Sequence, residues 1–194
     1  MKQLKLSSLF KPAFLAVVGA SEKPGPGLQV IENLRVLGFK GKIIPVNPKY
    51  EKVLGLQCFP SLTAVKEAGF SVDMVAILLG KNNVLPVAQE AAATGVKAAW
   101  AFAAGFGETG TEGKAIENEL RNLCAKSNML FLGPNCVGYL NPNDKTGAYS
   151  APVPREIKGG NIGMVTQSGY LGLAVANNSR GLGFGLICTT GNEE

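Results

Sequence analysis

Five short apolar runs, each followed by a segment of helical periodicity, constrain the fold of this chain more than any other feature. The runs lie at residues 14–18, 42–46, 73–79, 96–102 and 129–132. Strands that are apolar throughout are typical of a parallel sheet covered by helices on both faces. The alternation therefore predicts an α/β fold with a Rossmann-like doubly wound parallel sheet. Ligands of such sheets bind beyond the carboxyl ends of the strands.

The pattern changes near residue 141, and this change predicts the domain organisation. Prolines and glycines are frequent up to residue 160, and a strand–helix–strand pattern then resumes. Thirty-odd residues of that pattern are too few to form a domain alone. We predict a first domain at 1–142, a linker at 143–160, and at 161–194 the truncated start of a second α/β domain. The chain is expected to be part of a longer protein or to pair with a partner that completes it.

The composition removes several classes of protein from consideration. The chain has no histidine, which excludes Ser-His-Asp triads, Cys-His pairs and histidine metal sites within it. The four cysteines form no C-x-x-C pair, which argues against a zinc site and for a reduced, cytoplasmic protein. We predict no metal site. A net charge of +5 without a dense block of Lys and Arg gives no indication of nucleic-acid binding.

Nothing in the sequence indicates a membrane. No apolar run approaches the ~20 residues that a membrane-spanning helix requires. The amino-terminal segment resembles a signal peptide only faintly, because Lys11 and Pro12 interrupt it. Residues 13–20 make a better first strand.

The glycine-rich segment GASEKPGPG, residues 19–27, connects the first apolar run to a helical pattern. A turn of this kind presents backbone N–H groups and the positive end of a helix dipole, which favour a phosphate. Ser21 adds a hydroxyl group and Lys23 a positive charge. The segment is not the dinucleotide fingerprint, because Ser21 replaces its second glycine. The alternative is a tight turn without a ligand.

The end of the second run helps to distinguish between ligands. NAD-binding domains place an acidic residue there for the ribose, whereas this chain has Lys49. A lysine favours a phosphorylated ribose, as in NADP or coenzyme A (CoA). The alternative is a solvated lysine on a turn.

Two later loops are weaker candidates for a functional site. The segment TQSG, residues 166–169, is either a second anion site at a helix N-terminus or a turn in which Ser168 caps the helix. Cys136 follows the fifth run. We interpret it as a packed side chain rather than a nucleophile, because the sequence shows no group to activate it.

Six segments taken in order resemble one family, the NDP-forming acyl-CoA synthetases, such as the ADP-forming acetate–CoA ligases, which are relatives of the succinyl-CoA synthetase α subunit. The segments are VVGAS (17–21), IPVNP (44–48), GLQCFPSL (55–62), AGFGETG (104–110), LGPNCVG (132–138) and VTQSG (165–169). The resemblance implies a CoA-binding Rossmann-like domain followed by the beginning of a flavodoxin-like succinyl-CoA-ligase domain. It also implies a reaction for the full enzyme: acid, CoA and ATP are converted reversibly to acyl-CoA, ADP and phosphate.

The resemblance also implies site residues. The first loop would hold the CoA phosphates, the second would flank the adenosine 3′-phosphate, and the third and fourth would line the pantetheine path. The implied cofactor-binding positions are Gly19, Ala20, Ser21, Lys23, Gly25, Gly27, Asn47, Pro48, Lys49, Leu79, Gly80, Phe102, Ala103, Ala104, Asn135 and Cys136. The positions implied to face the acyl and phosphoryl chemistry are Asn135, Gln167, Ser168 and Gly169.

Two departures limit this expectation. The prolines and glycines at residues 23–27 differ from the small residues common in the family. The family's phosphate-carrying histidine and its nucleotide-binding domain would lie outside this chain. ATP, ADP and Mg would then enter through other ligase domains, in cis or on a partner subunit, and the chain alone is expected to be inactive. Homo-oligomer formation is left open.

Two other functions compete with the ligase. One is a non-catalytic CoA-sensing module, as in the ligase-like halves of some protein acetyltransferases. The other is an NADP-dependent oxidoreductase, which the missing fingerprint and the lack of histidine disfavour.

Overall fold

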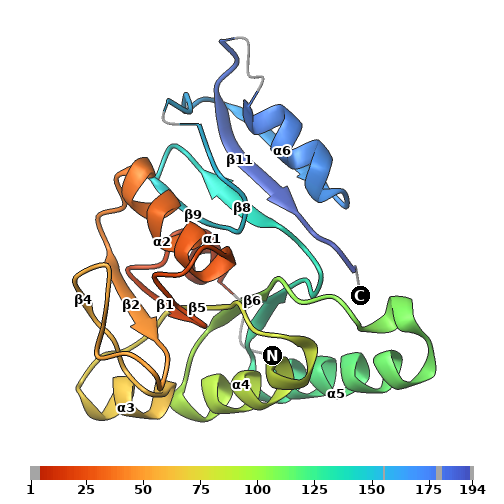
Figure 1. Ribbon diagram of the computed structural model, residues 1–194. Helices are drawn as coiled ribbons and strands as arrows, with labels where there is room; N and C mark the ends of the chain where they lie inside the picture. Colours follow the sequence, from red (N-terminus) through yellow and green to blue (C-terminus); the bar gives the residue numbers. More distant parts are fainter. Residues whose placement is uncertain (1–4, 155, 178–180, 193–194) are drawn as a thin grey trace.

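The computed structural model describes residues 5–154, 156–177 and 181–192, so parts of the three predicted ranges lie outside it. Its centre is a parallel five-stranded sheet of order β2-β1-β5-β6-β7 (Figure 1). The strands are β1 (Phe14–Val18), β2 (Lys42–Val46), β5 (Met74–Ile77), β6 (Ala98–Ala101) and β7 (Leu130–Leu132). In chain order this is 2-1-3-4-5, one of the two common doubly wound orders. The predicted fold class is confirmed.

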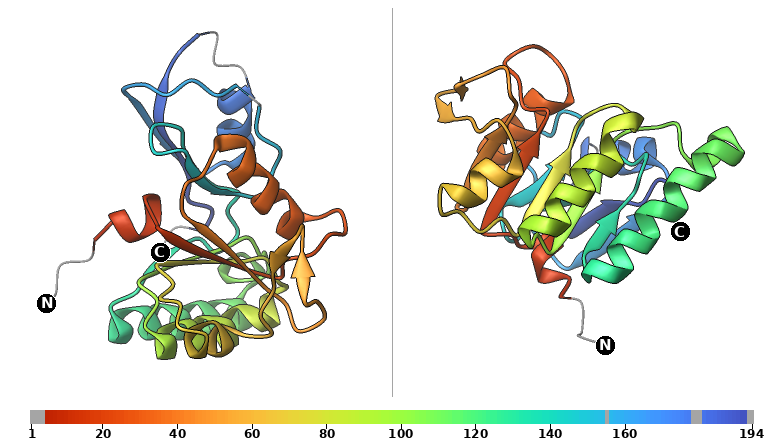
Figure 2. Two further views of the ribbon diagram at one scale, coloured as in Figure 1. Left: turned by 90° about the vertical axis from the view of Figure 1, so that its left-hand side faces the viewer. Right: turned by 90° about the horizontal axis from the view of Figure 1, so that it is seen from below.

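Helices cover both faces of this sheet, as its apolar strands require. They are α1 (Ser7–Phe10), α2 (Pro26–Leu37), α3 (Leu62–Glu67), α4 (Lys81–Thr94) and α5 (Thr111–Ser127). Seen from below, α3, α4 and α5 lie side by side across one face (Figure 2). Side chains alternate along β1: Leu15 and Val17 pack with α2, and Ala16 and Val18 pack toward α3, α4 and α5.

Two sequence patterns bear on these elements. Pro45, a proline inside an apolar run, predicts a strand near the edge of the sheet, and β2 is the edge strand. Residues 83–94 predict a helix that is capped by Asn83 and has Pro86 in its first turn, but the helix begins at Lys81 instead. Gly80 takes the extended conformation of the N-cap, and the Asn83 N–H donates to the Gly80 carbonyl. Pro86 therefore lies inside the helix rather than in its first turn.

A second sheet of order β10-β11-β8-β9 lies beyond α2. Its elements are β8 (Gly138–Asn141), β9 (Thr146–Tyr149), β10 (Ile162–Thr166), β11 (Phe184–Thr189) and the helix α6 (Gly169–Asn177). β8 and β9 form an antiparallel hairpin, and β11 joins β8 antiparallel and β10 parallel. The segment expected to be a linker thus contains a strand. The division of the chain into two domains stays a prediction.

The two sheets share one core. Tyr139 and Ala148 of the second sheet belong to the same buried cluster as Leu15 and Val17 of the first. The helix α2 lies between the sheets, packing on β1 on one side and on β9 on the other (Figure 1). The first sheet therefore depends on the hairpin to cover α2.

Asn33 is a buried polar residue that joins α2 to the chain after β9. Its side-chain nitrogen donates to the carbonyls of Tyr149 and Ala151 at 2.7 and 2.8 Å. Its side-chain oxygen accepts from the N–H of Val153 at 3.3 Å and from Gln29 at 3.0 Å. Both ends of this amide are satisfied, so its burial carries no unpaired polar group.

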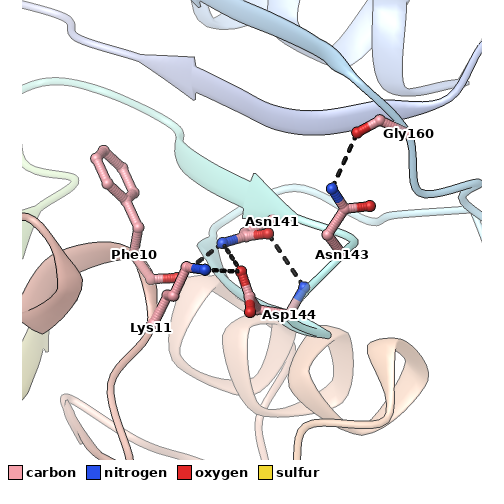
Figure 3. A network of polar contacts seen from close by, with 6 residues as sticks. All are labelled: Phe10, Lys11, Asn141, Asn143, Asp144 and Gly160. Atoms are coloured by element: carbon pink, nitrogen blue, oxygen red, sulfur yellow. Dashed lines mark hydrogen bonds and ion pairs between the residues drawn. The ribbon is translucent and has the colours of Figure 1, made fainter.

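The turn of the β8–β9 hairpin holds the carboxyl end of α1 (Figure 3). The side chain of Asn141 donates to the last carbonyl of α1 at 3.1 Å and to the Asp144 carboxylate at 2.8 Å. That carboxylate also pairs with Lys11 at 3.0 Å. Asn143 donates to the carbonyl of Gly160 at 2.9 Å. The turn therefore connects α1, the hairpin and the approach to β10.

Two small elements complete the architecture. A hairpin of β3 (Lys52–Val53) and β4 (Leu56–Gln57) lies beside β2, and a 3-10 turn, η1 (Gly107–Thr109), follows β6. Within the described ranges, no helix has both the length and the apolar character needed to cross a membrane.

Candidate functional site

The first loop, residues 19–27, brings the start of α2 against the end of β1. A side chain at residue 27 would place its Cβ 2.2 Å from the carbonyl oxygen of Gly19, so only glycine fits there. Gly19 has φ +90° and donates its N–H to Val46 at 3.0 Å. Gly25 occupies the N-cap of α2 without a side-chain cap. The positive end of the α2 dipole thus lies at the carboxyl edge of the sheet.

Ser21 and Lys23 lie on the rim of this loop. The Ser21 oxygen accepts the N–H of Lys23 at 2.9 Å, which leaves the hydroxyl hydrogen to donate elsewhere. Lys23 is exposed. Pro24 and Pro26 supply no N–H, so the loop offers fewer backbone donors than a glycine-only turn.

Asn47 ties the second loop to the first. Its side-chain nitrogen donates to the Ala20 carbonyl at 2.8 Å, and its oxygen accepts the N–H of Lys49 at 3.0 Å. Lys49 is exposed beside a cleft of about 550 Å³. The cleft is lined by Pro48, Lys49, Tyr50, Glu51, Gln57, Cys58 and Pro60. Lys49, the ring of Tyr50 and the acidic Glu51 thus line one cleft, and the hydrogen bond from Asn47 to Ala20 ties this loop to the glycine-rich loop.

The third and fourth loops continue along the same edge. A Cβ on Gly19 would lie 2.6 Å from the Leu78 carbonyl oxygen and 3.0 Å from the Leu79 side chain. The ends of β1 and β5 therefore touch at the point where the strand order reverses, which is where doubly wound sheets bind ligands. Phe102, after β6, is 41% exposed although it is aromatic. A Cβ on Gly105 would meet the side chain of Lys81 at 2.7 Å, so the two loops are in contact.

Cys136 in the fifth loop is buried and belongs to the core. The indole N–H of Trp100 lies 3.2 Å from its carbonyl oxygen and 3.0 Å from its sulfur. Burial raises the pKa of the Cys136 thiol to about 12. The thiol is protonated at neutral pH and is no nucleophile, which agrees with the interpretation as a packed side chain.

The loops of the two sheets meet at Asn135, which has φ +58°. A Cβ on Gly191 would lie 2.3 Å from the Asn135 carbonyl oxygen, and the Gly191 N–H donates to the Gln167 carbonyl at 3.4 Å. The structure thus brings Asn135 and the 166–169 turn together. The Ser168 oxygen accepts the N–H of Leu171 at 3.3 Å, so Ser168 does cap α6.

Sequence reasoning did not single out two polar residues of this junction, Glu108 and Asn192. The Asn192 side-chain nitrogen donates to Glu108, and its oxygen accepts from Asn135 at 3.3 Å. Glu108 lies inside the AGFGETG segment, but nothing in the sequence indicates a partner 84 residues away.

A glycine-rich loop, a helix dipole, a cleft with a cation and a switch point are the features with which doubly wound sheets bind nucleotide-type cofactors. Comparison with known proteins identifies the class. The profile of the CoA binding domain family matches residues 14–142. The chain therefore belongs to the CoA-binding domain family.

The resemblance to NDP-forming acyl-CoA synthetases that the six segments predict is confirmed, because the curated relatives include ADP-forming acetate–CoA ligases. Acetate–CoA ligase [ADP-forming] II of Archaeoglobus fulgidus is 37% identical over 97% of this chain and 28% of its own length. The α subunit of acetate–CoA ligase [ADP-forming] II of Pyrococcus furiosus is 36% identical over 96% of this chain and 40% of its own.

A solved structure shows the same fold. It is the dinucleotide-forming acetyl-coenzyme A synthetase 1 of Ca. Korarchaeum cryptofilum in complex with phosphate and ADP. It superposes with a TM-score of 0.88 and 35% identity over 98% of this chain and 40% of its own. The chain thus spans well under half of the length of these relatives.

Proposed function

We propose that this chain is the CoA-binding portion of an ADP-forming acid–CoA ligase that acts on a small carboxylic acid such as acetate. The full enzyme would convert the acid, CoA and ATP reversibly to acyl-CoA, ADP and phosphate. The observation that carries the proposal is the contact between the Gly19 loop and the end of β5 at the switch point. It supplies a cofactor site of the right kind in a member of a CoA-binding family.

The loops would divide the cofactor between them. The first loop and the positive end of α2 would face the pyrophosphate, and Ser21 and Lys23 would donate to it. Lys49 would pair with the adenosine 3′-phosphate, with the adenosine in the cleft beside Tyr50. The ends of β5 and β6, with Phe102, would line the pantetheine arm on its way to Asn135. In this arrangement the chain binds and orients CoA, and its buried Cys136 takes no covalent part.

The second sheet supports a larger assembly. Val165 in β10, the edge strand of the second sheet, is 69% exposed although it is apolar. Tyr170 and Leu171, at the start of α6, are 88% and 50% exposed. Apolar exposure of this size marks an interaction surface. We propose that the remaining ligase domains, in cis or on a partner subunit, cover it and bring the nucleotide, its Mg and the phosphate-carrying histidine.

The chemistry of the described cysteines suits a reducing compartment. Cys58, Cys124, Cys136 and Cys188 are all free thiols. We therefore propose a cytoplasmic location.

Calorimetry with CoA, dephospho-CoA, NADP and NAD tests the CoA assignment. We expect CoA to bind about tenfold more tightly than dephospho-CoA, because a charge-assisted hydrogen bond from Lys49 to the 3′-phosphate is lost in the latter. Lys49→Ala should abolish this difference and leave dephospho-CoA affinity unchanged. Lys97→Ala, a change of the same kind at the opposite end of the sheet, is the matched control.

Each outcome bears on a separate part of the proposal. No binding of CoA at millimolar concentration would exclude the cofactor assignment. Equal affinity of the unaltered chain for CoA and dephospho-CoA would remove the role of Lys49. Tighter binding of NADP than of CoA would favour an oxidoreductase instead.

A further inference from the structure

Glu108 connects the two sheets of the molecule at the carboxyl edge. Its carboxylate accepts the N–H of Gly105 at 2.6 Å and that of Phe106 at 3.1 Å, which fixes the loop after β6. The same carboxylate accepts the side-chain amide of Asn192, which follows β11. We call this group of three residues the latch: Glu108, Asn192 and Asn135.

The hydrogen bonds of the latch have a fixed direction. Because a carboxylate only accepts, Asn192 must turn its nitrogen toward Glu108. Its oxygen then points to Asn135 and accepts the Asn135 nitrogen at 3.3 Å. The Asn192 N–H donates to the Pro134 carbonyl at 3.0 Å, which holds Asn192 in place. The side-chain oxygen of Asn135 is therefore left facing away from the latch as an acceptor.

We infer that Glu108 is a positioning residue that, through Asn192, presents the side-chain oxygen of Asn135 to the pantetheine end of CoA. This inference rests on the proposed function. The pantetheine arm carries two amide N–H groups and a thiol S–H, all of them donors that suit an acceptor at Asn135. The nucleotide end of CoA lies at the opposite side of the site, near Lys49, and does not depend on the latch.

The electrostatics of Glu108 agree with an engaged carboxylate. Partial burial alone would raise the pKa of Glu108, but the hydrogen bonds from Gly105 and Asn192 outweigh it, so the pKa lies below its usual value. Glu112, four residues further along, has a 4.0 Å ion pair with Lys81 and an 83% exposed side chain. It offers a matched control for any charge effect.

The substitution Glu108→Gln tests the latch because it keeps the shape of the side chain but no longer fixes the direction of the hydrogen bond with Asn192. A glutamine amide can turn a donor toward Asn192, which allows the amides of Asn192 and Asn135 to flip. Calorimetry with CoA and with adenosine 3′,5′-bisphosphate, which lacks the pantetheine arm, separates the two ends of the cofactor. We expect Glu108→Gln to bind CoA about fivefold more weakly, which is at the low end of the coupling between two sites. Binding of the bisphosphate should be unchanged.

Two further measurements separate positioning from a general effect on folding. Hydrogen exchange of the unliganded chain should show faster exchange at Gly105 and Phe106 in Glu108→Gln and not in Glu112→Gln. Asn192→Ala should weaken CoA binding to the same extent, and the double variant no further, because both residues act through one hydrogen bond.

The possible results distinguish the inference from the proposed function. If the unaltered chain binds no CoA, both fail. If it binds CoA but Glu108→Gln weakens neither ligand, or both equally, the latch inference alone is overturned. An effect of Glu112→Gln equal to that of Glu108→Gln also overturns it, because general charge would then be the cause.

Discussion

The side-chain amide of Asn33 donates a hydrogen bond of 2.7 Å to the carbonyl of Tyr149, 116 residues later in the sequence. A single buried amide thus links the helix after the first strand to the hairpin that covers it. The amide is 1% exposed, so water cannot replace its partners.

Asn33→Ala should lower the free energy of unfolding by about 2 kcal/mol, because the Tyr149 and Ala151 carbonyls lose their shared donor. Urea unfolding followed by tryptophan fluorescence measures the change. Asn118→Ala, at an exposed position of α5, is the control and should alter stability little. Equal effects of the two substitutions would contradict the linking role of Asn33.

Gly27→Ala should destabilise the chain by about 3 kcal/mol, the upper end for overpacking, since its Cβ would overlap the backbone of Gly19. Any movement that relieves the overlap displaces the first loop, so CoA affinity should fall as well. Gly163→Ala is a suitable comparison, because nothing lies within 4 Å of a Cβ there. A stable Gly27→Ala variant with unchanged CoA affinity would disprove the proposed place of the loop in the site.

Glu117 is 4% exposed, and its two side-chain oxygens have no hydrogen-bond partner among the described residues. Replacing it by methionine should raise the free energy of unfolding by about 2 kcal/mol, because a buried polar group without a hydrogen-bond partner is costly. Glu119→Met, on the exposed side of the same helix, should bring no such gain. Loss of stability in Glu117→Met would show that the carboxylate has a stabilising role.

Two buried thiols, Cys136 and Cys188, and the half-buried thiol of Cys124 should make the chain less stable in alkali. Burial raises the pKa of Cys136 to about 12 and that of Cys124 and Cys188 to about 11. Because the unfolded chain ionises these groups first, near pH 8.5, their contribution is complete below that pH and is lost as the pH rises toward the folded values. Thermal unfolding between pH 7 and 10 should show this loss, and Cys136→Ala should reduce it. A melting temperature that does not change with pH in this range would contradict it.

Asp144 should have the opposite pH dependence. The hydrogen bond and charge of Lys11 lower the pKa of its carboxyl group, with Asn141 adding to the effect. The stabilising contribution is therefore present above the unfolded value near 4 and is lost as the pH falls through the folded value. The difference in melting temperature between the unaltered chain and Asp144→Asn should shrink below pH 4. A difference that stays constant would show that the pair with Lys11 contributes nothing.

The first sheet could be predicted from the sequence because each of its strands is apolar on both faces. Pro45 even indicated which strand is at the edge. The hairpin could not be predicted in the same way, since β9 is only four residues long and follows a turn rich in Asn and Pro. In the structure β9 pairs with β8 and packs on α2, and β8 pairs on its other side with β11. Both α2 and β11 lie far from the hairpin in the sequence.

The candidate site, too, could be predicted from the sequence only in part. The loops after the strands were predictable, because carboxyl ends of parallel strands meet at one edge. The roles assigned to single residues there stay predictions. The contact between Glu108 and Asn192 could not be foreseen, because it joins loops of two different sheets, and the AGFGETG segment that contains Glu108 does not indicate a partner 84 residues away.

The pairing of β8 with β11 has a consequence for the order in which the molecule can be built. During synthesis the first sheet can close once β7 has left the ribosome, since its strands and helices are then complete. The β8–β9 hairpin can settle on α2 at that time, but the edge of β8 waits for some forty further residues to supply β11. In that interval β8 is an unpaired edge, the kind of surface that chaperones protect.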